Sequence, residues 1–392
     1  MSQQSAEVME EIDAKSSIAL LKNLIKINSI NPPGNELEVA KVIDSYARDA
    51  GLHTVIKPLT KNRSNIIVRL NGKDPSRAPL IFSGHLDTVP IGDNTWNADP
   101  FSGEIIDGKL YGRGTSDMKG GVAALIEAMK VLNSHSDKPD ADIIFVGTAG
   151  EEVDCFGASE IIKDDTLKNA AAMIIAEPSN GKVFCAHKGA LWLQITVYGK
   201  TAHGSMPEQG TNAIIHMHEL LDKLRRYKFT YTQDHNLLGK PTLNIGTITG
   251  GIQTNVVPDR CTVTLDIRTI PETSHQDIIN DIEGILAMMN DENQDFNAEI
   301  EVKNNLPALE NVNNNEFVQL AMDVNYDLYG VKKEDIGANY YTDASIYSSA
   351  LNIPIIIYGP GNEAVAHQPD EYIEIESFLN SISYYVELAR RY

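Results

Sequence analysis

Cysteine is scarce in this 392-residue chain, which contains only Cys155, Cys185 and Cys261. The three are widely spaced and form no C-x-x-C pair, so the sequence predicts neither a disulfide framework nor a thiolate zinc site. Basic residues are also few, because 33 Lys and Arg stand against 54 Asp and Glu, for a formal net charge of −21. This balance argues against nucleic acid as a partner, since a phosphate backbone requires a basic face.

Long apolar runs are missing as well. No stretch approaches the roughly 20 apolar residues that a membrane span needs. The N-terminal "MSQQSAEVMEEIDAKSS" is polar and acidic and lacks the apolar core of a signal peptide. We therefore expect a cytoplasmic protein with no membrane partner. The length suits about two domains at roughly 100–200 residues each, and 42% hydrophobic residues suffice for a buried core.

Four short apolar runs predict an α/β domain with a largely parallel sheet flanked by helices. The runs are "APLIFSGHLD", "ADIIFVGTAGEE", "AAMIIAEPS" and "IPIIIYGPG", and helical patterns lie between several of them. One helix is predicted in "GGVAALIEAMKVL", where apolar residues recur on one face.

The middle of the chain has a different pattern. In "RCTVTLDIRTI" every second residue is apolar, which is typical of an antiparallel sheet with one exposed face. Two amphipathic helices accompany it, and their apolar stripes are Ile214, Met217, Leu221, Leu224 and Ile278, Ile282, Ile285, Met289. We predict a catalytic metal-binding domain formed by residues 1–187 and 297–392, interrupted by an inserted α+β domain at residues 188–296.

Residues that can bind a metal or move a proton follow the apolar runs. His85 and Asp87 follow the first run, and Glu151 and Glu152 the second. Further candidates are Asp117 at the start of a predicted helix, Glu177 after the third run and His367 after the fourth. Because the functional crevice of an open α/β sheet lies at the carboxyl ends of its strands, we expect all of them at one sheet edge.

Each of these residues alone has an ordinary structural explanation. A histidine after a strand is usually hydrogen-bonded within the fold, and Asp117 could be only a helix N-cap. The glycine-rich "GRGTSDMKGG" matches no phosphate-binding loop. Their coincidence favours a metal site, because close carboxylates raise one another's pKa unless cations hold them. Two divalent ions would balance three ligating carboxylates and a hydroxide, and mixed His and carboxylate ligands suit Zn²⁺ or Co²⁺, with Mn²⁺ as a further choice.

The segments "SGHLDTVP", "GRGTSDMKGG", "GTAGEE", "AEPS" and "GPGNEAVAHQPDEYI" resemble the dinuclear-zinc aminoacylase/carboxypeptidase family. The similarity covers nearly the whole chain in order. The resemblance implies that Asp117 bridges two metal ions. His85 and Glu177 would complete one site, and Glu152 and His367 the other. The implied metal ligands are His85, Asp117, Glu152, Glu177 and His367.

The resemblance also implies roles for five further residues. Asp87 is similar to the acid that orients His85, and Glu151 to the general base. The inserted domain resembles a lid that usually also forms a homodimer. Within it, "GKTAHGSMPEQGTNAI" implies that His203 reaches the developing oxyanion across a dimer, and "GGIQTNVVPDR" and "LDIRTIP" imply that Asn255 and Arg268 bind the substrate carboxylate. A fork-shaped guanidinium suits that task.

The family resemblance leaves several substrates open. The family includes succinyl-diaminopimelate desuccinylase, acetylornithine deacetylase, aminoacylase and several di- and tripeptidases. The segments "HKGALW…GKTAHGSMPEQGTNAI" and "YGPG…AHQPDEYI" resemble those of desuccinylases. This resemblance favours hydrolysis of N-succinyl-LL-diaminopimelate, a step of lysine biosynthesis, over acetylornithine deacetylation, broader N-acyl-amino-acid hydrolysis or dipeptide cleavage. The acyl pocket could involve "NYYTDASIY", through Tyr341, Thr342 or Asp343.

Two readings lie outside this class. A non-catalytic metal-binding scaffold would be expected to lose ligands or the base, whereas every such position is filled here. An acidic interaction module without a cofactor would hold no stoichiometric metal.

Overall fold

The computed structural model describes residues 8–135, 138–231, 233–311 and 315–392. The chain forms two compact units, of which the second comprises His187–Leu309 and Asn339–Tyr341 and the first comprises the rest. The second unit extends beyond residue 296, where we predicted the insertion to end. The reason is that β12 (Asn297–Leu306) pairs with β9 (Gly189–Tyr198) and so belongs to the sheet of the second unit.

The first unit is built on a six-stranded sheet in the order β1-β2-β6-β3-β7-β15. Strands β6, β3, β7 and β15 run parallel, whereas β2 pairs antiparallel with β1 and β6. This confirms the predicted α/β fold with a largely parallel sheet. The strand bounds are β1 His53–Pro58, β2 Ser64–Leu70, β3 Leu80–His85, β6 Ile143–Thr148, β7 Ala172–Ile175 and β15 Ile355–Ile357.

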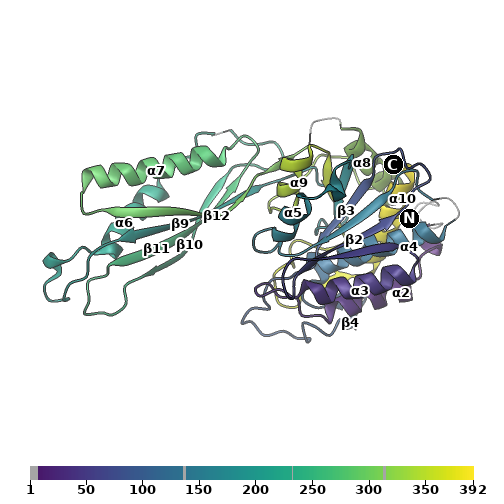
Figure 1. Ribbon diagram of the computed structural model, residues 1–392, viewed down its shortest axis with the longest axis horizontal. Helices are drawn as coiled ribbons and strands as arrows, with labels where there is room; N and C mark the ends of the chain where they lie inside the picture. Colours follow the sequence, from purple (N-terminus) through teal and green to yellow (C-terminus); the bar gives the residue numbers. More distant parts are fainter. Residues whose placement is uncertain (1–7, 136–137, 232, 312–314) are drawn as a thin grey trace. The chain divides into compact units, whose positions relative to one another are not determined.

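Helices flank this sheet on both sides (Figure 1). Helix α3 packs against β1 and β2, and α4 packs against β3 and β6 and contacts α2 and α10. Helix α5 also contacts β2 and β6, and α9 packs against α5. The helix bounds are α2 Ala14–Ile25, α3 Glu36–Asp49, α4 Gly120–Ser134, α5 Phe156–Ile161, α8 Glu316–Tyr329, α9 Ala344–Leu351 and α10 Ile375–Arg391.

Short strands complete the set. One three-stranded sheet has the order β16-β5-β4, and another has the order β13-β8-β14. The bounds are β4 Ile105–Ile106, β5 Lys109–Tyr111, β8 Ala186–His187, β13 Leu309–Glu310, β14 Gly337–Ala338 and β16 Tyr372–Glu374. Strand β16 follows the segment that carries His367, so its pairing with β5 brings that segment beside the residues that precede Asp117.

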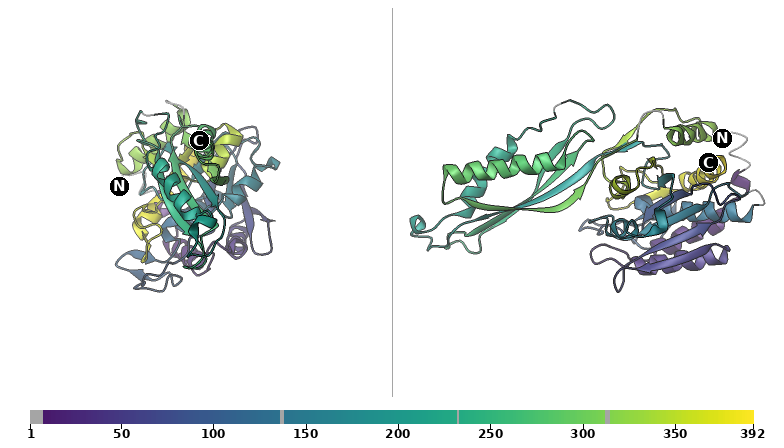
Figure 2. Two further views of the ribbon diagram at one scale, coloured as in Figure 1. Left: turned by 90° about the vertical axis from the view of Figure 1, so that its left-hand side faces the viewer. Right: turned by 45° about the horizontal axis from the view of Figure 1, so that its top comes forward.

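The second unit is a four-stranded antiparallel sheet in the order β10-β11-β9-β12, with α6 and α7 on one face (Figure 2). The alternating residues of "RCTVTLDIRTI" behave as predicted, because Cys261, Val263, Leu265 and Ile267 are buried while Thr262, Thr264, Asp266 and Arg268 are partly exposed. The remaining bounds are β10 Thr242–Gly250, β11 Arg260–Thr269, α6 Ala213–Arg225 and α7 His275–Glu292. The core of this unit includes Leu193, Ile195, Val263, Leu265, Met217, Leu220, Leu224, Ile278, Ile282 and Met289.

One predicted core residue of α6 lies outside this core. Ile214 was expected on the apolar stripe, but its side chain is 39% exposed. The buried stripe instead includes Ala213 and Leu220. Asn212 caps the helix through its side chain, so Ile214 falls in the first turn and lies against Gly250 at the end of β10. The stripe is therefore shifted by one residue at its start.

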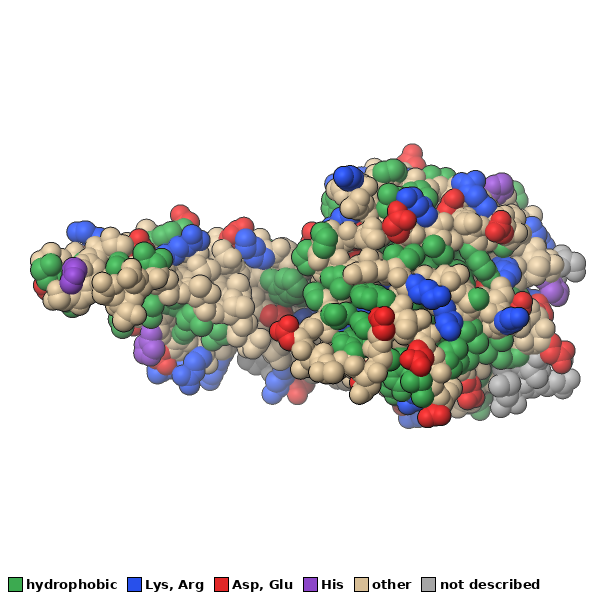
Figure 3. Space-filling model, turned by 90° about the horizontal axis from the view of Figure 1, so that it is seen from below, with side chains coloured by type: hydrophobic (Ala, Val, Ile, Leu, Met, Phe, Trp, Pro, Cys, Tyr) green, Lys and Arg blue, Asp and Glu red, His purple; other side chains and the backbone are tan. Residues whose placement is uncertain are grey.

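On the face drawn in Figure 3, acidic and basic side chains are scattered among hydrophobic and other side chains. Cys155, Cys185 and Cys261 are buried free thiols. Among the described residues, none of the helices combines the length and the apolar character required to cross a bilayer.

A glycine contact holds the start of α4 against the end of β7. An added Cβ at Gly121 would lie 2.1 Å from the carbonyl oxygen of Ala176, the residue before Glu177. We predict that Gly121→Ala lowers the free energy of unfolding of the first unit by about 1–3 kcal/mol, because backbone must move to make room. Denaturant unfolding followed by circular dichroism measures this change.

Gly284 in α7 provides the matched control. An added methyl group there meets nothing within 4 Å, so Gly284→Ala should stabilise its helix by roughly 0.5–1 kcal/mol. Equal stability of Gly121→Ala and the unmodified protein would contradict the close contact between α4 and β7.

Candidate metal centre

The parallel strands place three groups of candidate residues at one sheet edge. Strand β3 ends at His85, which is paired in register with Thr148 at the end of β6. Strand β7 ends at Ile175, opposite Ser83 of β3. The turn after β6 therefore carries Glu151 and Glu152, and the residues after β7 carry Glu177, to the edge where His85 lies.

Asp117 lies between the two predicted imidazole ligands. Its Oδ1 is 3.1 Å from Nε2 of His85, and its Oδ2 is 3.2 Å from Nε2 of His367. The same nitrogen of His367 is 3.2 Å from Glu152 Oε2. One carboxylate thus presents one oxygen to each imidazole, which is the arrangement expected of a ligand that bridges two ions.

The remaining carboxylates surround His85. Its Nε2 is 3.7 Å from Glu177 Oε1 and 3.9 Å from Glu151 Oε2. Its Nδ1 lies 3.0 Å from the main-chain oxygen of Asp87, which can only accept. Nδ1 therefore carries a proton, and in the neutral imidazole Nε2 offers its lone pair to the carboxylate cluster. Such an orientation is suited to a cation.

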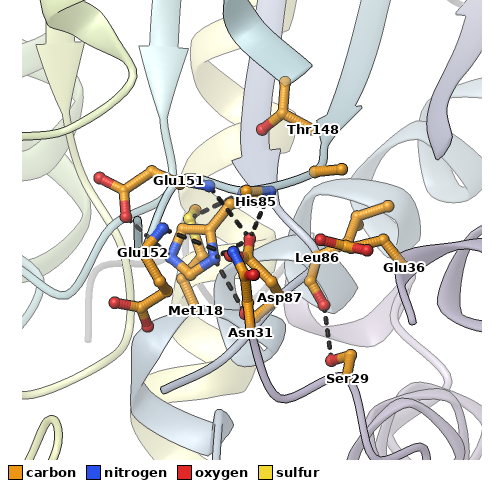
Figure 4. A network of polar contacts seen from close by, with 12 residues as sticks. Ser29, Asn31, Glu36, His85, Leu86, Asp87, Met118, Thr148, Glu151 and Glu152 are labelled. Carbon is orange, nitrogen blue, oxygen red and sulfur yellow. Dashed lines mark hydrogen bonds and ion pairs between the residues drawn. The ribbon is translucent and has the colours of Figure 1, made fainter. Parts of the chain in front are cut away.

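Asp87 does more than face His85. Its Oδ1 accepts hydrogen bonds from the main-chain N–H groups of Gly150 (3.0 Å) and Glu151 (3.2 Å), and its Oδ2 accepts from Glu152 N–H (3.3 Å). The Asn31 side chain donates to Oδ2 as well, at 2.9 Å. Figure 4 shows Asn31, Glu151 and Glu152 gathered around the Asp87 carboxylate. A single buried side chain thus positions the turn that carries both glutamates.

Without cations, the neighbouring carboxylates of the cluster destabilise one another's ionised forms. Burial and the neighbouring carboxylates raise the pKa of Glu177 and that of Glu151 well above the ordinary value. Burial opposes charge on His85, but Glu177 and Asp117 raise the pKa of its imidazole well above the usual range. The pKa of His367 is raised to about 11: burial lowers it, but the hydrogen bonds to Asp117 and Glu152 outweigh that effect.

The residues present fit divalent metal ions. Ligand atoms of His85, Glu151 and Glu177 lie within 4.8 Å of one another, and so do those of His85, Asp117 and Glu152. Glu152 Oε1 is buried and has no hydrogen-bond partner, as expected of an oxygen reserved for a cation. Imidazole and carboxylate donors together are a common ligand set for Zn²⁺ and related ions. The assignment of ligands and base within this cluster stays a prediction.

The residues predicted to bind substrate lie in the second unit. His203 is exposed, and its Nδ1 is 2.7 Å from Ser205 Oγ. Asn255 is also exposed and lies near His203 in space, because the N–H of the next residue, Gly204, donates to the carbonyl oxygen of Asn255 at 2.8 Å. Arg268 projects from the polar face of β11.

Arg268 is held by neighbours that the sequence did not reveal. Its Nε is 2.9 Å from Asp266 Oδ1, and its guanidinium lies over the ring of Tyr341, 5.4 Å from the centroid. Trp192 donates its ring N–H to the same aspartate and packs edge-on against Tyr341. Asp343, which we considered together with Tyr341 for the acyl pocket, belongs to the first unit and is buried there.

Sequence reasoning also missed Glu371. This buried carboxylate pairs with Arg113 at 2.6 Å and accepts main-chain hydrogen bonds from the loop that carries Asp117. Its position within the "DEY" stretch gave no signal of this contact.

These features define a hydrolase with a metal centre at the carboxyl edge of an α/β sheet. Residues 81–391 match peptidase family M20/M25/M40, and the chain belongs to that family. The resemblance predicted from the sequence is thereby confirmed. So is the enzyme class, because members of the family hydrolyse amide bonds.

Relatives cover nearly the whole chain. A probable succinyl-diaminopimelate desuccinylase of Staphylococcus aureus strain N315 is 29% identical over 422 residues, covering 98% of this chain and 99% of the relative. An acetylornithine deacetylase of Photorhabdus laumondii is 32% identical over 373 residues, covering 92% and 93%. The fold is shared with an M20-family metallo-carboxypeptidase of Sulfolobus solfataricus, with a TM-score of 0.81 at 19% identity over 95% of this chain and 98% of that one.

We predict that Asp87→Asn weakens the binding of Co²⁺ or Zn²⁺ by about 10–100-fold, the usual effect of removing a group that orients metal ligands. The asparagine would turn an N–H donor toward main-chain N–H groups that need an acceptor. Competition with a chromophoric chelator measures the dissociation constant. Asp164→Asn, at an exposed N-cap, should leave the affinity unchanged. A twofold effect or less for Asp87→Asn would show that this contact does not support the centre.

Proposed function

We propose that this chain hydrolyses N-succinyl-LL-diaminopimelate to succinate and LL-diaminopimelate, a step of lysine biosynthesis. Two divalent ions, Zn²⁺ or Co²⁺, would be its cofactors, held by the predicted ligands. The observation that carries amide hydrolysis is the Asp117 carboxylate between two imidazoles, with Glu151 beside His85. The choice of substrate is supported by the probable desuccinylase of S. aureus, which aligns over nearly both full lengths.

Glu151 would move the proton in this reaction. Bound metal ions supply polarisation of the amide carbonyl and a lowered pKa of water. The Glu151 carboxylate takes a proton from the attacking water, whose oxygen bonds to the carbonyl carbon. The carbon–nitrogen bond then breaks, and Glu151 returns the proton to the leaving amine.

Three residues of the second unit would bind the rest of the substrate. Arg268 and Asn255 would receive the carboxylate of the amino acid, and His203 of a second copy of the chain would donate to the oxyanion that develops on the amide oxygen. Asp266 and Tyr341 support this role of Arg268, because they fix the direction of the guanidinium before any ligand arrives.

Deacetylation of acetylornithine is the second candidate, supported by the relative from P. laumondii at 32% identity. Both substrates carry an amino-acid carboxylate that Arg268 could bind. Their acyl groups differ, because succinyl carries a free carboxylate and acetyl carries none. A comparison of the two substrates therefore separates the candidates.

We predict that the cobalt-loaded protein hydrolyses succinyl-diaminopimelate with a higher kcat/KM than acetylornithine or a panel of dipeptides. Glu151→Gln should lower kcat by about 10²–10⁴-fold, the usual contribution of a general base, and keep its metal. Product amine release and metal content give the two measurements. A preference for acetylornithine would select the second candidate, and near-normal turnover of Glu151→Gln would refute the assignment of the base.

We also propose that the second unit forms a homodimer. Strand β10 is an edge strand of its sheet and is exposed along most of its length. Apolar side chains gather at its end, where Ile214 lies against Gly250, and Ile215 and Ile248 are each more than half exposed. An unpaired edge beside exposed isoleucines favours association with a second copy.

Ile215→Lys should therefore convert a dimer into a monomer, because a charge would be placed in the apolar contact. Sedimentation velocity measures the mass of each variant. Met288→Lys, at a similarly exposed position on α7, is the control and should remain dimeric. A monomeric unmodified protein would rule out this dimer.

A further inference from the structure

Glu371 makes an unusually complete set of contacts with the loop before α4. Its Oε1 accepts hydrogen bonds from the main-chain N–H groups of Ser116 (2.8 Å) and Asp117 (3.0 Å). Its Oε2 accepts from Gly114 N–H (3.0 Å) and from Arg113 Nη1 (2.6 Å). All four partners are donors, so the geometry calls for an ionised carboxylate with two donors on each oxygen.

The ion pair with Arg113 lies deep in the first unit. Arg113 is 1% exposed and Glu371 is fully buried. The guanidinium also donates to the carbonyl oxygen of Pro90 at 3.2 Å and lies over the ring of Trp96. The charge of Glu371 is therefore balanced and fixed in direction, because its partner is itself immobilised on two sides.

The same two stretches of chain are joined at further points. Gly112 N–H donates to the main-chain oxygen of Glu371 at 2.8 Å. Asn362 N–H donates to Ser116 Oγ at 2.6 Å, and this hydroxyl donates to the carbonyl oxygen of Asn362 at 3.1 Å. The segment that carries His367 is thus attached at both of its ends, at Asn362 and at Glu371, to the loop that carries Asp117.

We propose that Glu371 is a positioning residue that sets the Asp117 carboxylate opposite His367 and so prepares the metal centre before any ion binds. Asp117 donates its own N–H to Glu371, so the carboxylate of Glu371 fixes the main chain from which the bridging ligand projects. Attachment of the His367 segment to the same loop fixes the 3.2 Å separation between the two side chains. The proposal rests on the metal centre of the proposed function but not on its substrate.

Glu371→Gln isolates this role. One oxygen becomes an NH₂ group, and whichever way the amide is turned, that group faces two donors instead of accepting from them. Glu371→Asp keeps the charge on a side chain shorter by one methylene, so it should restore part of the effect. Glu374→Gln is the matched control, because Glu374 lies three residues further on, on β16, with a side chain that is 54% exposed.

The experiment uses the full-length, metal-free protein titrated with Co²⁺ in competition with a chelator, with the visible absorption of bound cobalt as a second readout. Glu371→Gln should bind Co²⁺ about 10–100-fold more weakly than the unmodified protein. Its cobalt spectrum should also change, since Asp117 and His367 no longer face each other in the same geometry. Glu371→Asp should fall between the two, and Glu374→Gln should match the unmodified protein.

Should Glu371→Gln fail to fold, Glu371→Asp takes its place as the test of the carboxylate. Ser116→Ala tests separately how the His367 segment is attached to the loop, without disturbing a buried charge. It removes the hydroxyl that makes two hydrogen bonds with Asn362 and should weaken Co²⁺ binding by about 2–10-fold, a net loss within the usual range for neutral hydrogen bonds.

Two outcomes would overturn the proposal. Folded Glu371→Gln, or folded Glu371→Asp where the amide variant does not fold, with unchanged cobalt affinity and spectrum would show that Glu371 supports only the fold, even if the melting temperature falls. An unmodified protein that binds no Co²⁺ would overturn both this proposal and the metal centre of the proposed function.

Discussion

The crowding of carboxylates at one sheet edge is the constraint on which the site depends. Parallel pairing of β3 with β6 and β7 brings the residues that follow these strands together, and four of those residues are acidic: Asp87, Glu151, Glu152 and Glu177. Burial and the repulsion between neighbouring carboxylates raise the pKa of Glu151 and of Glu177. Such a cluster persists only if the main chain around it is held firmly, and if cations compensate its charge.

The fold meets the first of these needs in the same way twice. Asp87 accepts main-chain N–H groups from the turn that carries Glu151 and Glu152, and Glu371 accepts them from the loop that carries Asp117. In both cases a buried carboxylate contacts the backbone behind the ligands and leaves the ligand oxygens free. This arrangement separates the groups that position the centre from those that would bind metal.

Much of the site could be predicted because its residues follow apolar runs that read as buried strands. His85, Glu152 and Glu177 are visible in this way, and the parallel order of the strands brings them together. Glu371 could not be found, since a carboxylate that contacts mostly main-chain N–H groups leaves no pattern of side chains in the sequence. Asn31 was missed for a similar reason, because its contact with Asp87 joins residues far apart in the chain.

The second unit shows the same limit. Alternation in β11 predicted the buried face of the sheet, but the contact of Tyr341 with Arg268 joins segments separated by many residues and follows no period. The end of the insertion was placed too early because β12 is mostly polar and exposed, so its composition does not identify it as a strand of the insertion. Only its pairing with β9 assigns it to the second unit.

The insertion leaves and re-enters the first unit at neighbouring points, because the N–H of Asn311 and its side-chain amide both donate to the carbonyl oxygen of Cys185. All of the predicted metal ligands lie outside the stretch between these two residues. Recombination at this narrow neck would exchange the inserted unit in a single genetic event and leave every predicted metal ligand in place.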